Sequence, residues 1–173
     1  MNTKILAMLV AMLATVSIGT AHAQAISATC DGACGILNGV TAIKMFDTVK
    51  VTDVHIDSPS AFIGGGFTHG WAWTFTLQVP CSENKVAMKF SDWVGASALQ
   101  GTIPANSNVQ FKTTGDWVSA SNAYGATADL TTVPSCDLAA GYTATVTVQA
   151  QVPAGSQPGS YASNYGVKTT STN

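Results

Sequence analysis

Hydrophobic and polar residues alternate without a break in the stretch that follows Gly70. Alanine, threonine and glutamine lie between its large apolar residues, which are Trp71, Trp73, Phe75, Leu77 and Val79. Successive side chains of a β-strand point to opposite faces of a sheet, whereas a helix would spread such residues around its whole circumference. The pattern therefore predicts a half-buried strand whose apolar face forms the centre of the core.

A second stretch with the same two-residue period covers residues 142–152, and its apolar face predicts core positions at Tyr142, Val146 and Val148. Shorter alternating runs such as Val86–Phe90 are separated by glycine, proline, serine and asparagine. No segment longer than a turn has helical periodicity. We expect an all-β fold, a single antiparallel β-sandwich of immunoglobulin-like or jelly-roll-like type with about 7–9 strands.

The apolar positions change parity between Val51 and Val54, which predicts a β-bulge near Thr52-Asp53. A bulge inserts one extra residue into a strand and so reverses the faces of the residues that follow it. We therefore expect a single bent strand here.

Asp53, His55 and Asp57 alternate on one face of this strand. Such a face could hold a metal ion, but a transition-metal site needs ligands that converge from more than one strand. Charges on an edge strand also discourage pairing with other chains. We favour a solvated edge and expect no metal.

The first 23 residues have the three parts of a secretory signal peptide: a basic start with Lys4, an apolar stretch, and the small-residue site Ala21-His22-Ala23. Cleavage after Ala23 would leave Gln24 first. The apolar stretch, about 14 residues, is shorter than the roughly 20 that span a bilayer. We expect a secreted protein that passes through the periplasm to the cell surface or the medium, with no membrane span in the mature chain.

The rest of the chain suits one domain. Residues 24–37 are small and polar and predict an irregular N-terminal segment, and residues 38–173 are expected to form the sandwich. Charged residues are only 9% of the chain. After the signal peptide there are lysines but no arginine, and acidic residues outnumber them. Nucleic acid is therefore excluded as a partner, since phosphate binding needs clustered basic residues. A nearly neutral surface instead favours self-association.

Four cysteines follow the signal peptide: Cys30, Cys34, Cys81 and Cys136. An even number in an exported protein predicts two disulfides, although the sequence alone does not choose among the pairings. Cys81 ends the central strand and Cys136 precedes the last long strand, so we favour a bond between them, with Cys30–Cys34 closing a small loop. The spacing is a poor match to a zinc site.

The sequence Asp92-Trp93-Val94 recurs as Asp116-Trp117-Val118. Two interpretations are open. Both indoles could plug the ends of the sandwich, because tryptophan is usually largely buried. Alternatively Trp93, Trp117 and Tyr124 could be contact aromatics, whose flat apolar rings with polar edges suit sugars.

Catalytic chemistry has no support in the sequence. There is no G-x-S-x-G elbow, and Glu83 is the only glutamate, so a glycosidase would need a pair of aspartates. We expect no enzymatic activity and no cofactor.

The run Val152–Tyr161 reads VPAGSQPGSY. It resembles the (I/V)PAGxxxGxY turn that joins the last two strands in spore-coat-U-like pilins and WxL-like surface proteins of bacteria. The central strand, which begins GWAWTFT at Gly70, is similar to the GWTLTV strand of the WxL-like proteins. The resemblance implies a surface or filament protein.

These observations favour a structural subunit of the cell surface or of an extracellular filament or pilus, joined by β-strand pairing or donation to copies of itself or to other surface proteins. The final strand, Tyr161–Thr169, has one charge, Lys168, and no proline, so its edge is poorly protected. The expected donor is Gln24–Thr29 or Lys168–Asn173. The alternative function is a carbohydrate-binding or adhesive module.

Overall fold

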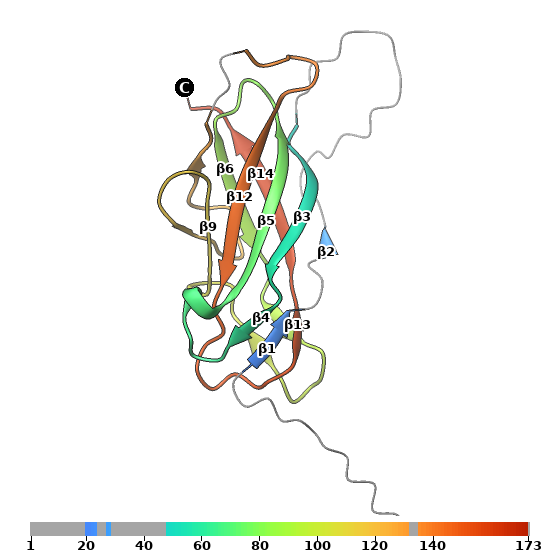
Figure 1. Cartoon of the computed structure of the whole chain (residues 1–173), viewed down its shortest axis with the longest axis vertical. Coiled ribbons are helices and arrows are strands. Elements are labelled where there is room, and N and C mark those ends of the chain that lie inside the picture. Colours follow the sequence, from blue (N-terminus) through green and yellow to red (C-terminus); the bar gives the residue numbers. More distant parts are fainter. Residues whose placement is uncertain (1–19, 24–26, 29–47, 132–134, 173) are drawn as a thin grey trace, which may run out of the picture.

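The computed structural model describes residues 20–23, 27–28, 48–131 and 135–172. These residues form an all-β, sandwich-like structure of strands β1 to β14 with one 3-10 turn, η1 (Phe67–His69) (Figure 1). Among them no helix is long and apolar enough to cross a membrane.

One layer is a five-stranded antiparallel sheet in the order β10-β9-β12-β5-β3. The central strand β5 pairs with β12 along its whole length, from Trp71 opposite Ala150 to Val79 opposite Tyr142. The strands are β3 (Lys50–Ser58), β5 (Trp71–Val79), β9 (Val109–Lys112), β10 (Val118–Ser119) and β12 (Tyr142–Ala150). The two long alternating stretches thus lie side by side as the centre of this layer.

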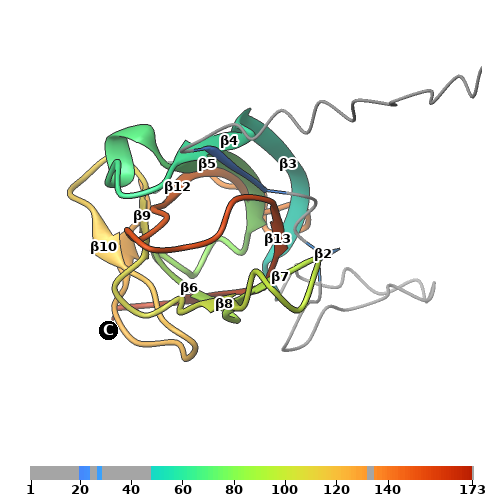
Figure 2. The same cartoon turned by 90° about the horizontal axis from the view of Figure 1, so that it is seen from below.

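Two further sheets have the orders β11-β6-β14-β2 and β4-β1-β13-β7-β8. The first lies in the second layer, and the other runs from β7 and β8 in that layer to β4, which lies beside β5 (Figure 2). The first has β2 (Ser27–Ala28), β6 (Lys85–Phe90), β11 (Ala128–Asp129) and β14 (Asn164–Thr170). The second has β1 (Thr20–Ala23), β4 (Ser60–Phe62), β7 (Trp93–Gly95), β8 (Thr102–Ile103) and β13 (Ser160–Ala162). Seen from below, β5 and β12 lie on one side and β6, β7 and β8 on the other (Figure 2).

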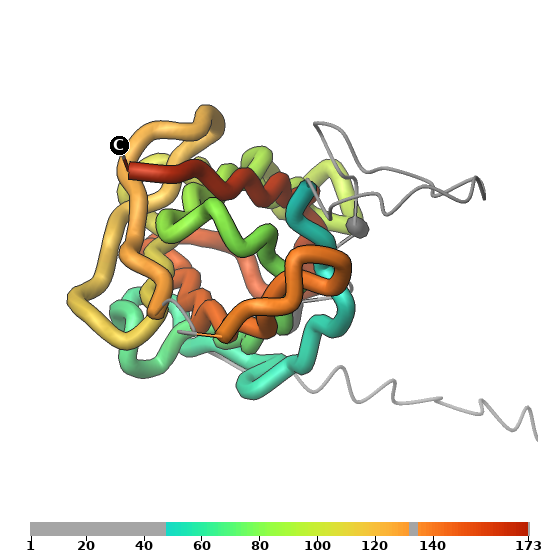
Figure 3. The backbone as a smooth tube through the Cα atoms, turned by 90° about the horizontal axis from the view of Figure 1, so that it is seen from above, coloured from blue at the N-terminus to red at the C-terminus, as the bar shows by residue number. Residues whose placement is uncertain are grey.

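The described strands outnumber the 7–9 expected, because long strands are interrupted. Pro59 separates β3 from β4, and Ser163 separates β13 from β14. The hydroxyl of Ser163 donates to the carbonyl of Ser91, 2.6 Å away, in the break between β6 and β7. Both breaks of the second layer therefore lie at the same level, and β14 still runs beside β6 (Figure 3).

The core lies between the layers. All eight residues expected there are buried, with at most 5% of their surface exposed: Trp71, Trp73, Phe75, Leu77, Val79, Tyr142, Val146 and Val148. The second layer adds Trp93, whose ring centroid is 5.1 Å from that of Trp71, and Tyr165, whose ring meets Phe75 edge-on at 4.8 Å. Burial of each large side chain contributes about 1.5–3 kcal/mol, so this aromatic cluster is the main contact between the layers.

The predicted bulge is confirmed. The pairing of β3 with β5 shifts register between Val51 and Asp53, and the hydroxyl of Thr52 donates to the carbonyl of Thr76 at 3.1 Å. A second shift lies between Ile56 and Ser58. These shifts bend the edge of this layer.

Two residues of the N-terminal segment expected over residues 24–37 are described, and both take part in a sheet. Ser27 and Ala28 pair in parallel with Asn164 and Tyr165 of β14. No pattern in the sequence predicts this short strand, because its pairing depends on a distant edge that supplies backbone partners. Cys30 and Cys34 lie outside the described residues.

Candidate functional site

The last strand is exposed to pairing on one side. On its inner side β14 pairs with β6 from Tyr165 opposite Phe90 to Thr170 opposite Lys85. On its outer side β2 reaches only as far as Tyr165. Among the described residues, Gly166–Thr170 have no strand on that side. Alternate backbone N–H and C=O groups there lack a sheet partner, which makes this edge a template for another strand.

The edge of the other layer is protected. Asp53, His55 and Asp57 of β3 are exposed, and His55 Nε2 lies 3.7 Å from Asp57 Oδ1. The hydroxyl of Thr74 donates to Asp57 Oδ2 at 2.7 Å. Charges and bulges together oppose strand addition at β3. No group of three or more His, Cys, Asp or Glu side chains in the described part of the chain could hold a metal ion.

The VPAGSQPGSY turn leads into β13, and the last strand, β14, follows. Hydrogen bonds of Tyr161 and Gln100 hold this turn in place. Tyr161 is 1% exposed, and its hydroxyl donates to the carbonyl of Gln157 at 2.6 Å. The Gln100 side chain donates to the carbonyl of Pro158 at 3.1 Å and accepts from the N–H of Ser97 at 2.8 Å. The turn is thereby tied to the loop between β7 and β8, and β13 starts at a fixed place.

Gly159 makes this arrangement possible. Its φ is +140°, a conformation that glycine adopts readily and other residues avoid. A Cβ at this position would lie 1.5 Å from Gln100 Nε2. The backbone conformation therefore requires glycine here, and any larger residue would also displace the Gln100 side chain.

A groove of about 300 Å³ lies beside the turn, between Gln100–Pro104 and Pro153–Gln157. Its lining has amide and hydroxyl groups but no ionisable side chain and no aromatic ring. It therefore offers neither an acid–base pair for catalysis nor a platform on which a sugar ring could stack.

The predicted contact aromatics do not form one surface. Trp93 has no exposed area, so its assignment as a contact residue is wrong: its ring fills the core instead. Trp117 is 36% exposed, with Lys112 Nζ 4.7 Å from its ring centroid. Tyr124 is half-buried and covers Gly166 of the other layer, where a Cβ would lie 2.4 Å from its hydroxyl. Trp117 alone is left as an exposed platform among the three.

The two copies of the Asp-Trp-Val sequence have different environments. Asp92 Oδ1 accepts hydrogen bonds from the Asn122 side chain at 2.8 Å and the Ala105 N–H at 2.9 Å. These bonds, that of Asn122 first, lower the pKa of Asp92. Asp116 is exposed. Sequence reasoning missed the role of Asp92 because both its partners come from later loops.

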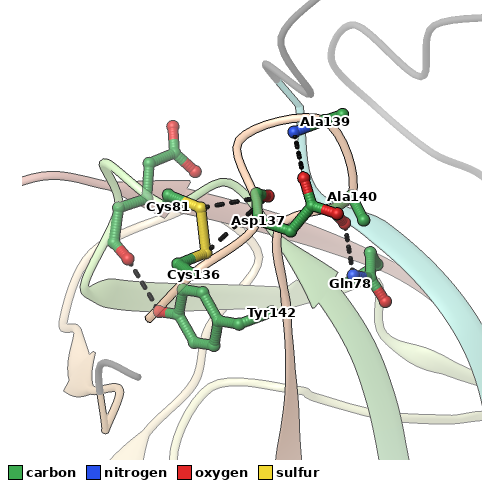
Figure 4. The surroundings of a disulfide bond; sticks show 8 residues. Gln78, Cys81, Cys136, Asp137, Ala139, Ala140 and Tyr142 are labelled. Atoms are coloured by element: carbon green, nitrogen blue, oxygen red, sulfur yellow. Dashed lines mark hydrogen bonds between the residues drawn. A yellow bond between two sulfur atoms is a disulfide. The ribbon is translucent and has the colours of Figure 1, made fainter. Parts of the chain in front are cut away.

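The Cys81–Cys136 disulfide is present, as favoured, with the Cα atoms 5.7 Å apart (Figure 4). Next to it the Tyr142 hydroxyl donates to the carbonyl of Glu83 at 2.7 Å, and Gln78 donates to the carbonyl of Ala140. Burial, with a smaller contribution from the charge of Glu83, raises the pKa of Tyr142. The ends of β5 and β12 are thereby fastened together, by a bond typical of oxidising compartments outside the cytoplasm.

No protein-family model matches this chain, and a comparison with curated proteins gives no match either. The site must therefore be interpreted from its own geometry. Its main features are an edge of β14 that no described strand covers beyond Tyr165, a protected edge at β3, and a turn before β13 that hydrogen bonds hold to the loop between β7 and β8.

Proposed function

We propose that this protein is a secreted, non-enzymatic structural subunit of the cell surface or of an extracellular filament, and that it assembles through β-strand pairing. The observation that carries the proposal is the outer edge of β14, where the pairings of the described residues are those of β2 with Asn164 and Tyr165. A strand from another copy can add to the rest of this edge through main-chain hydrogen bonds.

The contrast between the two edges supports this function. Gly166–Thr170 carry a single charge, Lys168, whereas β3 has two aspartates, a histidine and two register shifts. A protein that needed to stay monomeric would be expected to protect both edges. The low charge of the whole surface acts in the same direction.

The pairings at the two ends of the chain favour one of the two donor segments considered. Lys168–Thr170 are built into the chain's own sheet opposite Lys85–Ala87, and the N–H of Thr172 donates to Asn84 Oδ1 at 2.8 Å. Releasing the C-terminal stretch would dismantle a core strand. Of Gln24–Thr29, by contrast, only Ser27 and Ala28 have described pairings. The N-terminal stretch is therefore our proposed donor.

The same proposal includes export of the protein from the cytoplasm and the type of its β-sandwich. The Cys81–Cys136 disulfide supports export to an oxidising environment, in agreement with the signal peptide predicted over residues 1–23. The sandwich is proposed to be of immunoglobulin-like or jelly-roll-like type. The VPAGSQPGSY turn, which ends in β13, supports a relationship to the spore-coat-U-like pilins and WxL-like surface proteins.

Charged edge variants test the proposal. In the double variant Asn164→Lys/Thr170→Lys, two lysines are added to outward positions of β14, as in protected natural edges. Light scattering and electron microscopy should show high-mass species for the wild-type protein and monomers for this variant. The control Thr74→Lys/Thr76→Lys adds the same charge to β5, which is paired on both sides, and should assemble like the wild type. A wild-type protein that stays monomeric at high concentration would contradict the proposal.

A carbohydrate-binding function is the second candidate, favoured by the exposed ring of Trp117 beside Lys112. Trp71, Trp73 and Trp93 are at most 1% exposed, so a polysaccharide that changes tryptophan fluorescence would act through Trp117. Titration of the wild type and of Trp117→Ala tests this. A fluorescence change that persists in the variant would contradict binding at this ring.

A further inference from the structure

The outer face of the layer that contains β5 and β12 presents a regular array of threonines. Thr74 lies opposite Thr147 and Thr76 lies opposite Thr145, so that the four form two adjacent pairs. All four are half-buried or exposed, because the residues between them along each strand point into the core. Within the described part of the chain, the hydroxyls of Thr76, Thr145 and Thr147 have no hydrogen bond. These groups therefore keep their capacity to donate and to accept.

A single row of side chains crosses this face at Thr147. Its neighbours are Lys112 of β9 on one side and Thr74 of β5 on the other, and Thr74 lies opposite His55 of β3. Neighbouring strands are about 4.8 Å apart, so the row covers about 14 Å. Next to it, the Lys112 ammonium lies 4.7 Å from the ring centroid of Trp117, which precedes β10. The row therefore runs from an indole to an imidazole across β9, β12, β5 and β3, which lie side by side (Figure 1).

The charges around this row favour a neutral ligand. Lys112 lies at one end, whereas Asp53 and Asp57 lie on the strand at the other end, with His55 between them. An anionic polymer along the row would be repelled by the two carboxylates, and a cationic polymer would be repelled by the ammonium. The middle of the row has only the hydroxyl and methyl groups of threonine. A neutral chain that carries hydroxyls avoids both repulsions and can form hydrogen bonds with the side chains of the row.

We propose that this row binds an extended neutral polysaccharide of β-1,4-linked sugars, which lies across the strands from Trp117 to His55. The rings of such a chain form a flat ribbon with apolar faces and hydroxyl edges. The faces can stack on the indole, and the edges can form hydrogen bonds with the threonines. A chain of α-1,4-linked sugars coils and would leave the row after a few rings. The straight row of a β-sheet therefore selects the ribbon.

This inference develops the second candidate function and goes beyond assembly through β14. β14 belongs to the other layer, so a strand added at its edge leaves the outer face of β5 and β12 uncovered. The second candidate function thereby gains a ligand class, a direction of the bound chain and contacts beyond Trp117. A filament of such subunits would present one row in each copy, so that weak contacts with single rows add up along the polysaccharide.

Calorimetric titration with cellohexaose and maltohexaose, the β-1,4- and α-1,4-linked hexamers of glucose, tests the inference. The wild-type protein should bind cellohexaose and should bind maltohexaose about tenfold more weakly or less. Trp117→Ala should abolish measurable binding of cellohexaose. Thr147→Val keeps the shape of the side chain and removes one hydroxyl, so it should weaken binding about 2- to 12-fold, the effect of one net hydrogen bond.

Thr143→Val is the matched control. It makes the same change on the same face, about 13 Å along β12 from Thr147, and should bind cellohexaose like the wild type. Equal losses in Thr143→Val and Thr147→Val would place the polysaccharide along β12 and would overturn the row as its site. Melting temperatures close to that of the wild type verify that the variants are folded.

The comparison of the two hexamers needs no variant and stays decisive if a variant fails to fold. Absence of cellohexaose binding to the wild type, or equal binding of both hexamers, would overturn the inference. If Trp117→Ala and Thr147→Val prevent assembly and leave cellohexaose binding unchanged, the face is a contact between copies, which overturns it as well. Assembly through β14 is tested separately by the charged edge variants, so the two proposals can fail independently.

Discussion

The indole of Trp93 stacks on the indole of Trp73 across the interior, with ring centroids 5.3 Å apart and planes 12° from parallel. Trp73 belongs to β5 in one layer and Trp93 to β7 in the other. Stacked aromatic pairs contribute about 0.5–1.5 kcal/mol beyond the area that they bury. This pair therefore joins the two layers near the centre of the core.

Trp73→Ala should strongly destabilise the fold. Truncation of a buried aromatic side chain to alanine costs about 3–5 kcal/mol, a large part of a typical total of about 5–15 kcal/mol. Urea unfolding measures the loss. Thr74→Ala, the control on the opposite face, loses an exposed hydrogen bond to Asp57 and should cost less than about 1.5 kcal/mol. Similar small effects from both changes would show that the faces are assigned wrongly.

Tyr161→Phe and Tyr165→Phe should have opposite effects on stability. The Tyr161 hydroxyl bonds to the carbonyl of Gln157, so its removal should cost about 1–3 kcal/mol. The Tyr165 hydroxyl is buried without a hydrogen-bond partner in the described residues, so its removal should leave the free energy of unfolding unchanged or higher. Thermal unfolding of the two variants measures both changes in stability. A loss in Tyr165→Phe as large as that in Tyr161→Phe would reveal a partner for this hydroxyl.

Asp92 should contribute to stability near neutral pH and lose that contribution in acid. Its pKa is lowered in the folded protein, by the Asn122 bond first and the Ala105 N–H second. The contribution is therefore present above the unfolded pKa, about 3.9, and is lost as the pH falls through the lower folded pKa. Asp92→Asn should be less stable than the wild type at pH 7, with a difference that narrows below about pH 4. Asp116→Asn, at an exposed aspartate, is the control; a constant difference for Asp92→Asn across this pH range would contradict the assignment.

Removal of the Cys81–Cys136 disulfide should lower the free energy of unfolding by about 3–4 kcal/mol. The bond joins residues 55 positions apart, and in the chain-entropy model its main effect is to restrict the unfolded chain. Guanidinium unfolding of Cys81→Ser/Cys136→Ser measures the loss. Peptide mapping of the wild-type protein that linked Cys81 to Cys30 or Cys34 would contradict the pairing.

Much of the core could be predicted from local pattern. The alternation in β5 and β12 identified the buried faces, and the change of parity at Thr52 located the bulge, because a strand repeats every two residues. Less of the candidate site could be predicted from the sequence. The role of Asp92 depends on Asn122, and the packing of Gly159 depends on Gln100, so neither can be seen in a local window.

The sequence by itself determined the fold class, the inward faces of the long strands and the residues for a disulfide between strand ends. These properties follow from the period of the backbone and from the chemistry of single side chains. Only the tertiary structure decided that Trp93 is buried while Trp117 is exposed, although both follow an aspartate. It also decided that β1 lies between β4 and β13. Both results depend on which distant strands become neighbours, and that choice is made by packing of the whole chain.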